Sequence, residues 1–110
     1  MPNVKIFVDE DLLAVQKTGL SQVLTRLRDI VSKHLEVHHS ACQFALLPVV
    51  ALSDQPAVNV EIHIMPHPSR TKEVLEAMGV EVQKELRDVT GKPVAFRCTQ
   101  LDPMTYVALK

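Results

Sequence analysis

The chain has 110 residues, 46% of them hydrophobic and 23% charged, which is the composition of one globular domain with a single core. Twelve basic and thirteen acidic residues give a formal net charge of −1, and aromatic residues make up only 4% with no Trp. This composition argues against a nucleic-acid-binding protein, which would carry a basic surface or aromatic stacking platforms.

Nothing in the sequence indicates a membrane or a secretory destination. The longest apolar run, from Phe44 to Leu52, is too short to span a bilayer. The chain does not begin with a basic segment followed by an apolar one, so no secretory signal is expected. Without such a signal, Cys42 and Cys98 are expected to be reduced thiols buried among aliphatic residues. These features predict a cytoplasmic protein.

The first strand is expected directly after Pro2. Val4, Ile6 and Val8 alternate with other residues, which is the period of a strand with one buried face. If Met1 is removed, Pro2 becomes a secondary amine at the mouth of a folded domain. Burial lowers the pKa of an amine by disfavouring its charged form, so Pro2 is a candidate general base. The alternative is that Pro2 simply marks the end of the chain.

A helix is predicted over residues 20–35, where aliphatic residues recur at three- and four-residue spacing. Thr18 or Ser21 is expected to cap its start, and residues 12–15 form either a helical turn or an extended loop. The charged residues of this region fall mostly off the apolar stripe and are expected on the solvated face: Arg26, Arg28, Asp29 and Lys33. Residues 41–52 then read as a strand interrupted by Pro48.

The second half repeats this order. Residues 58–64 form a strand with alternating apolar residues, and a helix follows with Ser69 as its predicted cap. Gly79 interrupts the helix and indicates close packing, while Gly91 and Pro93 mark its end. Residues 94–100 form the last long strand, and residues 105–109 are expected to add a short closing strand.

The predicted fold is therefore α+β: two βαβ repeats, about 1–52 and 56–110, form one domain over residues 1–110. They would build a four-stranded mixed sheet with both helices on one face. Asn3–Val8 and Asn59–Ile64 are identical at three of six positions, which supports the repeat. The same element order also occurs in the ferredoxin-like split βαβ fold, which leaves a ligand-sensing module as an alternative.

Three features resemble the tautomerase superfamily: Met1-Pro2 before a strand, Pro48 after the second strand, and a Leu101-Asp102-Pro103 turn that leads to the C-terminal residues. Its carboxymethyl-hydroxymuconate isomerase and macrophage migration inhibitory factor branches are the most similar in length and element order. The resemblance implies an enzyme without a cofactor, in which Pro2 moves a proton between the enol and keto forms of a small oxo acid. It also implies a homotrimer whose sheets face a central axis, with sites at subunit boundaries.

The substrate-binding residues of that family have only partial counterparts. Where the isomerase branch places arginines early in the second strand, this chain has residues 41–43, Ala-Cys-Gln. Lys33 and Arg97 lie near positions that carry polar site residues in the cytokine branch, and His63 lies on the polar face of its strand. These three residues are the candidate substrate contacts. The missing arginines leave open a second alternative, a non-catalytic oligomer with the same fold.

A metal site is not expected. His34 and His38 have the four-residue spacing of helical metal ligands, but no third ligand or HExxH pattern accompanies them. Histidines at the end of a helix also interact favourably with the helix dipole, which explains the pair without a metal.

Overall fold

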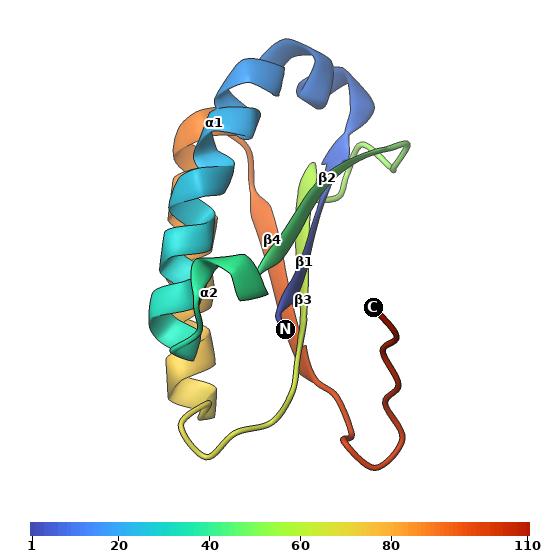
Figure 1. The fold of residues 1–110 in the computed structure, drawn as a ribbon. Helices are drawn as coiled ribbons and strands as arrows, with labels where there is room; N and C mark the ends of the chain where they lie inside the picture. The colour runs from blue at the N-terminus through green and yellow to red at the C-terminus, as the bar shows by residue number, and fades with distance from the viewer.

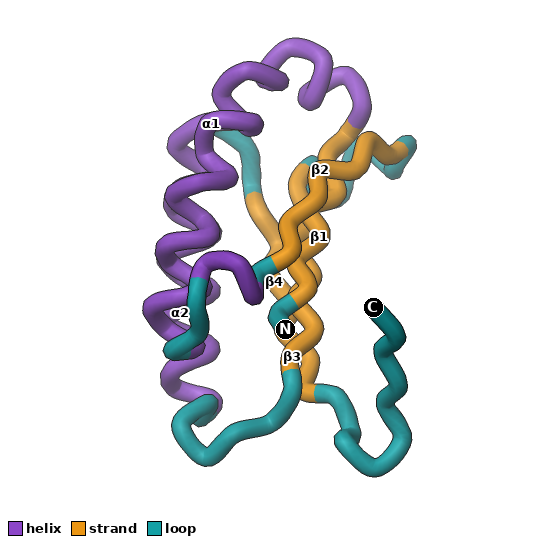
Figure 2. Tube along the Cα trace, in the orientation of Figure 1, coloured by secondary structure: helices purple, strands orange, loops and turns teal.

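The computed structural model describes residues 1–110 and shows a four-stranded sheet with two long helices on one face (Figure 1). The tube in Figure 2 shows the same two layers, with the C-terminal tail on the side away from the helices. Neither helix is long and apolar enough to cross a lipid bilayer. The elements in chain order are β1 (Asn3–Asp9), α1 (Glu10–Leu35), the short 3₁₀ helix η1 (His39–Ala41), β2 (Gln43–Val49), β3 (Val58–Ile64), α2 (Lys72–Thr90) and β4 (Val94–Gln100).

The strand order is β2-β1-β3-β4, which confirms the predicted α+β fold. β1 pairs with β2 in parallel, β3 pairs with β4 in parallel, and the two halves meet where β1 and β3 run antiparallel. In a split βαβ fold another strand separates the two parallel strands of each unit. Because the parallel strands here are direct neighbours, the ferredoxin-like alternative is wrong.

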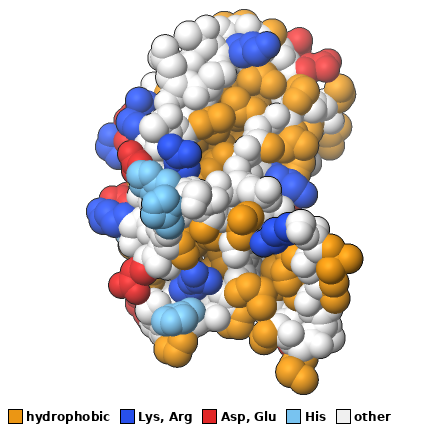
Figure 3. All heavy atoms as spheres, in the orientation of Figure 1, with side chains coloured by type: hydrophobic (Ala, Val, Ile, Leu, Met, Phe, Trp, Pro, Cys, Tyr) orange, Lys and Arg blue, Asp and Glu red, His pale blue; other side chains and the backbone are white.

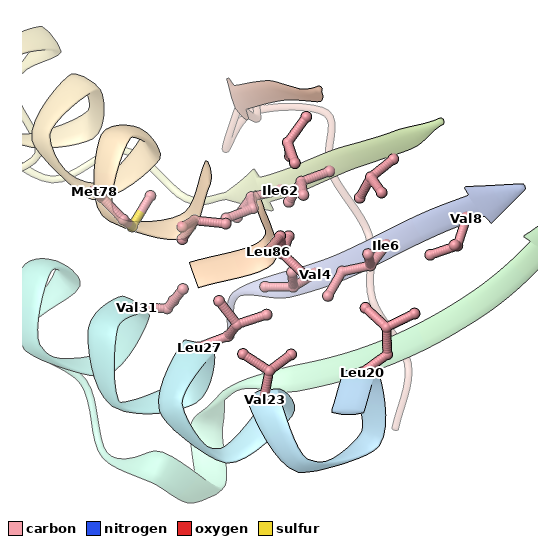
Figure 4. Packing of buried hydrophobic residues seen from close by; sticks show 14 of the residues in the cluster. Val4, Ile6, Val8, Leu20, Val23, Leu27, Val31, Ile62, Met78 and Leu86 are labelled. Carbon is pink, nitrogen blue, oxygen red and sulfur yellow. The ribbon is translucent and has the colours of Figure 1, made fainter. Parts of the chain in front are cut away.

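The core lies between the helices and one face of the sheet. Val4, Ile6 and Val8 of β1 face the helices and are at most 1% exposed, as the alternation predicts. They pack with aliphatic residues of both helices, including Leu27 and Leu86 (Figure 4). In Figure 4, labelled side chains of both helices lie against the apolar side chains of β1 and β3.

The second strand is shorter than predicted. It covers Gln43–Val49, not residues 41–52, and it forms an edge of the sheet. Pro48 lies within β2 and is paired with Val8 of β1. Proline has no N–H to donate, and a strand tolerates this at the edge of a sheet, where one side of the strand has no partner. Every residue of β2 is partly buried or exposed.

The predicted helix caps were wrong for both helices. α1 begins at Glu10, and the Asp9 carboxylate accepts hydrogen bonds from the backbone N–H groups of Asp11 and Leu12. Backbone angles at Gln16 depart from helical values, so α1 consists of a first segment and a long amphipathic one joined at a kink. The Thr71 hydroxyl, not Ser69, caps α2 by accepting from the N–H of Val74.

The two glycines singled out in the second half act as predicted. Gly91 has a φ of 67° and ends α2 in the left-handed conformation that glycine adopts without strain. Gly79 is buried, and a Cβ added there would lie 2.6 Å from Cδ1 of Phe96. The helix therefore approaches β4 more closely than any side chain at this position would allow.

The C-terminal residues do not form the expected closing strand. After β4 the chain makes a turn at Asp102 and continues to Lys110 without pairing to the sheet. The Lys110 ammonium lies 3.9 Å from the Met1 sulfur, so the tail returns to the N-terminal end of β1. Four of its apolar side chains are exposed: Met104, Tyr106, Val107 and Leu109.

The two helices are joined on their outer side by His34 and Glu81, whose side chains form an ion pair. The hydrogen bond from His34 is the main cause that holds the pKa of Glu81 below its ordinary value. The pKa of Glu81 is lower in the folded protein than in the unfolded chain, where it is about 4.3. The pair therefore contributes its full stabilisation above the unfolded pKa, and this stabilisation is lost as the pH falls through the folded pKa. The Glu81 side chain is 45% exposed, so solvent screens the pair and it is worth less than about 1 kcal/mol.

Glu81→Gln should therefore lower the free energy of unfolding more at about pH 6 than at about pH 3, because the stabilisation from the ionised carboxylate is lost as the pH falls through its lowered folded pKa. Urea unfolding at both pH values measures this. Glu76→Gln, on an exposed carboxylate of the same helix without an ion pair, is the matched control. An equal loss for both variants would show that the effect is not due to the pair.

Candidate functional site

Pro2 is buried at the start of β1, although Met1 before it is 47% exposed. Its carbonyl oxygen accepts a hydrogen bond of 2.9 Å from the N–H of Gln43. Asn3 pairs with Gln43 of β2 and with His63 of β3. Pro2 comes one residue earlier, so its neighbours on the two strands are Cys42 and Ile64. The nitrogen of Pro2 therefore lies among apolar neighbours at one end of the sheet, with Met1 leading outward.

Cys42 links this position to the first helix. Its side chain packs against the edge of the core and lines a cavity of about 240 Å³, together with Phe44, Leu24, Thr25 and Arg28. Burial raises the pKa of the Cys42 thiol, and the positive charges of Arg28 and of the N-terminus oppose this increase. The cavity thus lies between α1 and β2, one strand away from Pro2.

Arg28 was predicted on the solvated face, and this expectation was wrong. Its Nε atom is buried and has no hydrogen-bond partner, and the side chain takes part in none of the ion pairs. Arg28 follows Leu24 by four residues and therefore lies above it on the same helix face. That spacing is the one sequence signal that could have identified Arg28 as a residue at the edge of the core.

A second half-buried arginine, Arg70, has a different environment. Its Nη1 donates to the carbonyl of Met65 at 2.6 Å and its Nη2 to the carbonyl of Leu35 at 3.5 Å. Arg70 therefore fastens the end of β3 to the end of α1. Its positive charge also opposes the burial that raises the pKa of the Cys98 thiol. With two backbone carbonyls as partners, Arg70 has a structural role, whereas Arg28 has no such partner.

The predicted substrate contacts lie apart from Pro2 within one chain. Lys33 is exposed on α1, and its charge acts on Glu81 of α2. Arg97 and His63 are exposed on the face of the sheet opposite the helices, as strand alternation requires. Arg97 donates to Asn59 at 3.3 Å, and His63 lies between Asn3 and Thr99. The sheet itself separates these two side chains from the buried Pro2.

A larger cavity than the one beside Cys42 lies at the other end of the sheet. It has about 960 Å³ and is lined by the start of α1, the loop after β2 and the end of α2, with Asp9, Asp54 and Lys92 among its residues. The seven residues of β1 separate it from Pro2 by about 20 Å. Pro2 is buried at its own end of the sheet, and that end is therefore the candidate site.

His34 and His38 do not share a helix face. α1 ends at Leu35, so His38 lies beyond the helix, where its Nδ1 contacts the hydroxyl of Ser40 at 2.8 Å. His34 instead pairs with Glu81. No three side chains of the types that bind metals converge anywhere in the chain. The sequence spacing of these histidines therefore reflects two separate structural contacts.

No protein-family model and no curated protein matches the sequence. Solved structures do match. A macrophage migration inhibitory factor-like protein from Entamoeba histolytica aligns with a TM-score of 0.74 and 14% identity over 97% of this chain and 94% of that chain. A fused 4-OT, described as a wild-type asymmetric trimer, aligns with a TM-score of 0.73 and 9% identity over 96% and 91%. Pt0534, crystallised after inactivation by 2-oxo-3-pentynoate, gives 0.70 and 20% over 94% and 89%.

These likenesses cover nearly the whole chain. The fold is that of the tautomerase superfamily, as the sequence resemblance implied. The identities are too low to transfer an activity or a substrate from any of these proteins. The chemistry of this chain has to be argued from its own residues.

Proposed function

We propose that this protein is a cofactor-independent tautomerase that interconverts the enol and keto forms of a small oxo acid, with Pro2 as general base after removal of Met1. The observation that carries the proposal is the burial of Pro2 at the end of β1, beside Cys42 and Ile64. A free amine in this place would be desolvated, which favours its uncharged, proton-accepting form.

The proposed reaction needs only a proton transfer. In the keto-to-enol direction, the Pro2 nitrogen takes a proton from the carbon next to the carbonyl. The enolate oxygen gains the negative charge, and the protonated amine then returns the proton to that oxygen. No electrons leave the substrate, so no redox cofactor is involved. The test is whether protein with a free Pro2 accelerates ketonisation of the enol of phenylpyruvate and loses this rate when Met1 is retained.

Lys33, Arg97 and His63 are proposed to bind substrate oxygens in an oligomer. Arg97 and His63 face away from the helices and therefore can reach only the Pro2 of a neighbouring chain. A cation near the carbonyl oxygen would stabilise the charge that develops there during enolisation. The oligomer is thus part of this proposal.

We propose a homotrimer. The tail exposes Tyr106, Val107 and Leu109, the edge strands β2 and β4 have no partner, and the fused 4-OT of similar fold is described as a trimer. Apolar segments and strand edges of this kind are covered by neighbouring subunits in assemblies. Figure 3 shows hydrophobic side chains along the tail and on the adjoining surface.

Light scattering should accordingly give a mass three times that of the 12.3 kDa chain at micromolar concentration. Val107→Asp combined with Leu109→Asp should shift the mass toward one chain, because a buried unpaired carboxylate is costly. Val80→Asp, at an exposed apolar residue on α2, should leave the trimer intact. A monomer for the unmodified protein would rule out the assembly.

The alternative is a non-catalytic oligomer of the same fold. The Ala-Cys-Gln sequence at residues 41–43 favours it, since the isomerase branch has arginines there. Absence of any rate with free Pro2 would support this alternative.

A further inference from the structure

The cavity at the end of the sheet opposite Pro2 has no part in the proposed reaction. It has about 960 Å³, near the upper end of the range of about 300–1,000 Å³ that is usual for ligand pockets. Three segments far apart in the chain form its walls: the start of α1, the loop after β2, and the end of α2 with the residues that follow it. Figure 1 shows the start of α1 arching away from β1 at this end, where the loop after β2 also projects.

Hydrogen bonds hold two of these walls together. The N–H of Asp9 donates to the carbonyl of Ala57 at 2.9 Å, which ties the start of α1 to the end of the loop. The side-chain amide of Asn59 donates to the carbonyl of Pro56 at 3.1 Å, which fixes the loop to β3. A surface that is already shaped in the free protein loses less conformational entropy when a partner binds.

Aliphatic side chains are exposed at this cavity. Val15 on α1 is 80% exposed and Leu52 in the loop is 68% exposed, and both line it. Val50, which is 84% exposed, lies one residue before Ala51, another lining residue. Exposed apolar surface with a polar rim is typical of an interaction site.

The charged residues of this cavity are mainly acidic. Three aspartates line it, Asp9, Asp11 and Asp54, and Lys92 is the one lining cation. None of the four takes part in an ion pair. The Asp9 carboxylate accepts from N–H groups at the start of α1, whereas Asp11 and Asp54 are exposed on two different walls. A partner with complementary charge is therefore basic.

We propose that this cavity binds a segment of a partner protein in which aliphatic residues alternate with Lys or Arg. In an extended segment, alternate side chains point to opposite faces, so the aliphatic ones can contact Val15 and Leu52 while the cations reach the rim. Because Asp11 and Asp54 are on different walls, cations spaced along a chain match them better than a single small amine does. The proposal is independent of the proposed function, since Pro2 is not among the lining residues.

A second copy of this chain is a less suitable occupant. Its exposed apolar segment is the tail over residues 101–110, which contains one acidic and one basic residue, Asp102 and Lys110. The tail therefore has no excess of basic residues to complement the aspartates.

The test is an NMR titration with three synthetic peptides that are acetylated and amidated at their ends. The peptide Lys-Leu-Arg-Leu-Lys should shift the amide signals of residues 9–16, 51–57 and 90–93. Glu-Leu-Glu-Leu-Glu reverses the charge and Lys-Ser-Arg-Ser-Lys removes the apolar side chains, so each should bind at least about 10-fold more weakly. Binding of the first peptide should weaken between about 0.05 and 0.5 M salt, because exposed charges are screened.

Two variants separate the apolar and the charged contributions. Leu52→Ser should weaken binding of the basic peptide about 5- to 30-fold, because it removes aliphatic surface that the peptide would cover. Asp54→Asn should weaken it about 2- to 5-fold, as expected for an exposed ion pair, and less at high salt. Val80→Ser and Glu76→Gln are the matched controls, because both residues are exposed on α2 outside the cavity, and they should leave the affinity unchanged.

The amide spectra show directly whether each variant is folded. Equal or tighter binding of the acidic peptide, shifts confined to other residues, unchanged affinity for Leu52→Ser, or no binding of the basic peptide would each overturn the proposal. Leu52→Asp should leave the mass measured by light scattering unchanged. A lower mass would show that this cavity is a contact between copies of the chain, and would overturn the proposal as well.

Discussion

Protein that retains Met1 should ketonise the phenylpyruvate enol about 10²–10⁴-fold more slowly than protein that begins at Pro2. The Pro2 nitrogen is an amide in the first form, and its lone pair is delocalised into the carbonyl, so it does not act as a base. In the second form it is a buried secondary amine beside Cys42 and Ile64. The two forms share every other residue, so a difference in rate isolates the amine.

The comparison requires two preparations of known N-terminus, which intact mass distinguishes by the mass of one methionine. A second readout is covalent labelling with 2-oxo-3-pentynoate, the reagent that inactivates Pt0534. The free amine should add to the conjugated alkyne, so the N-terminal peptide should gain the full mass of the reagent only when Met1 is absent. Equal rates above background in both preparations would show that Pro2 is not the base.

Gly79→Val should lower the free energy of unfolding by about 1–3 kcal/mol, the usual cost of overpacking. The substitution has an opposing effect, because glycine within a helix is unfavourable by up to about 1 kcal/mol. The clash prevails because the added Cβ would lie 2.6–2.7 Å from Cδ1 and Cε1 of Phe96, in the body of a rigid ring. To make room, α2 would have to move away from β4 or the ring would have to leave its rotamer.

A double-mutant cycle separates these two effects. In a Phe96→Leu background, which removes the ring, the same Gly79→Val substitution should cost much less, with a coupling energy of about 1 kcal/mol or more. Urea unfolding of the four proteins at one protein concentration provides the measurement. Equal costs in both backgrounds would mean that Phe96 is not what excludes a side chain at position 79.

Local patterns in the sequence predicted the four strands and the amphipathic part of each long helix, but the closing strand predicted at residues 105–109 was wrong. Alternation in residues 58–64 and the stripe from Leu20 to Leu35 reflect burial on one side of an element, which local spacing records directly. The exposure of His63 follows from the same alternation. Boundaries were predicted less well, because Asp9, Thr18 and Thr71 are all capping residues by type, and only the path of the chain selects among them.

The tertiary structure alone decided what surrounds Pro2. Strand order and register place Cys42 beside it, and helix packing then brings Arg28 of α1 to the same cavity. These contacts join residues far apart in the chain, and their geometry depends on how α1 lies across the sheet. The sequence by itself determined a βαβ repeat that begins with a buried proline. Packing of α1 against β2 decided that Arg28 lines a cavity with Cys42 and Phe44, because that contact depends on how the helix lies across the sheet.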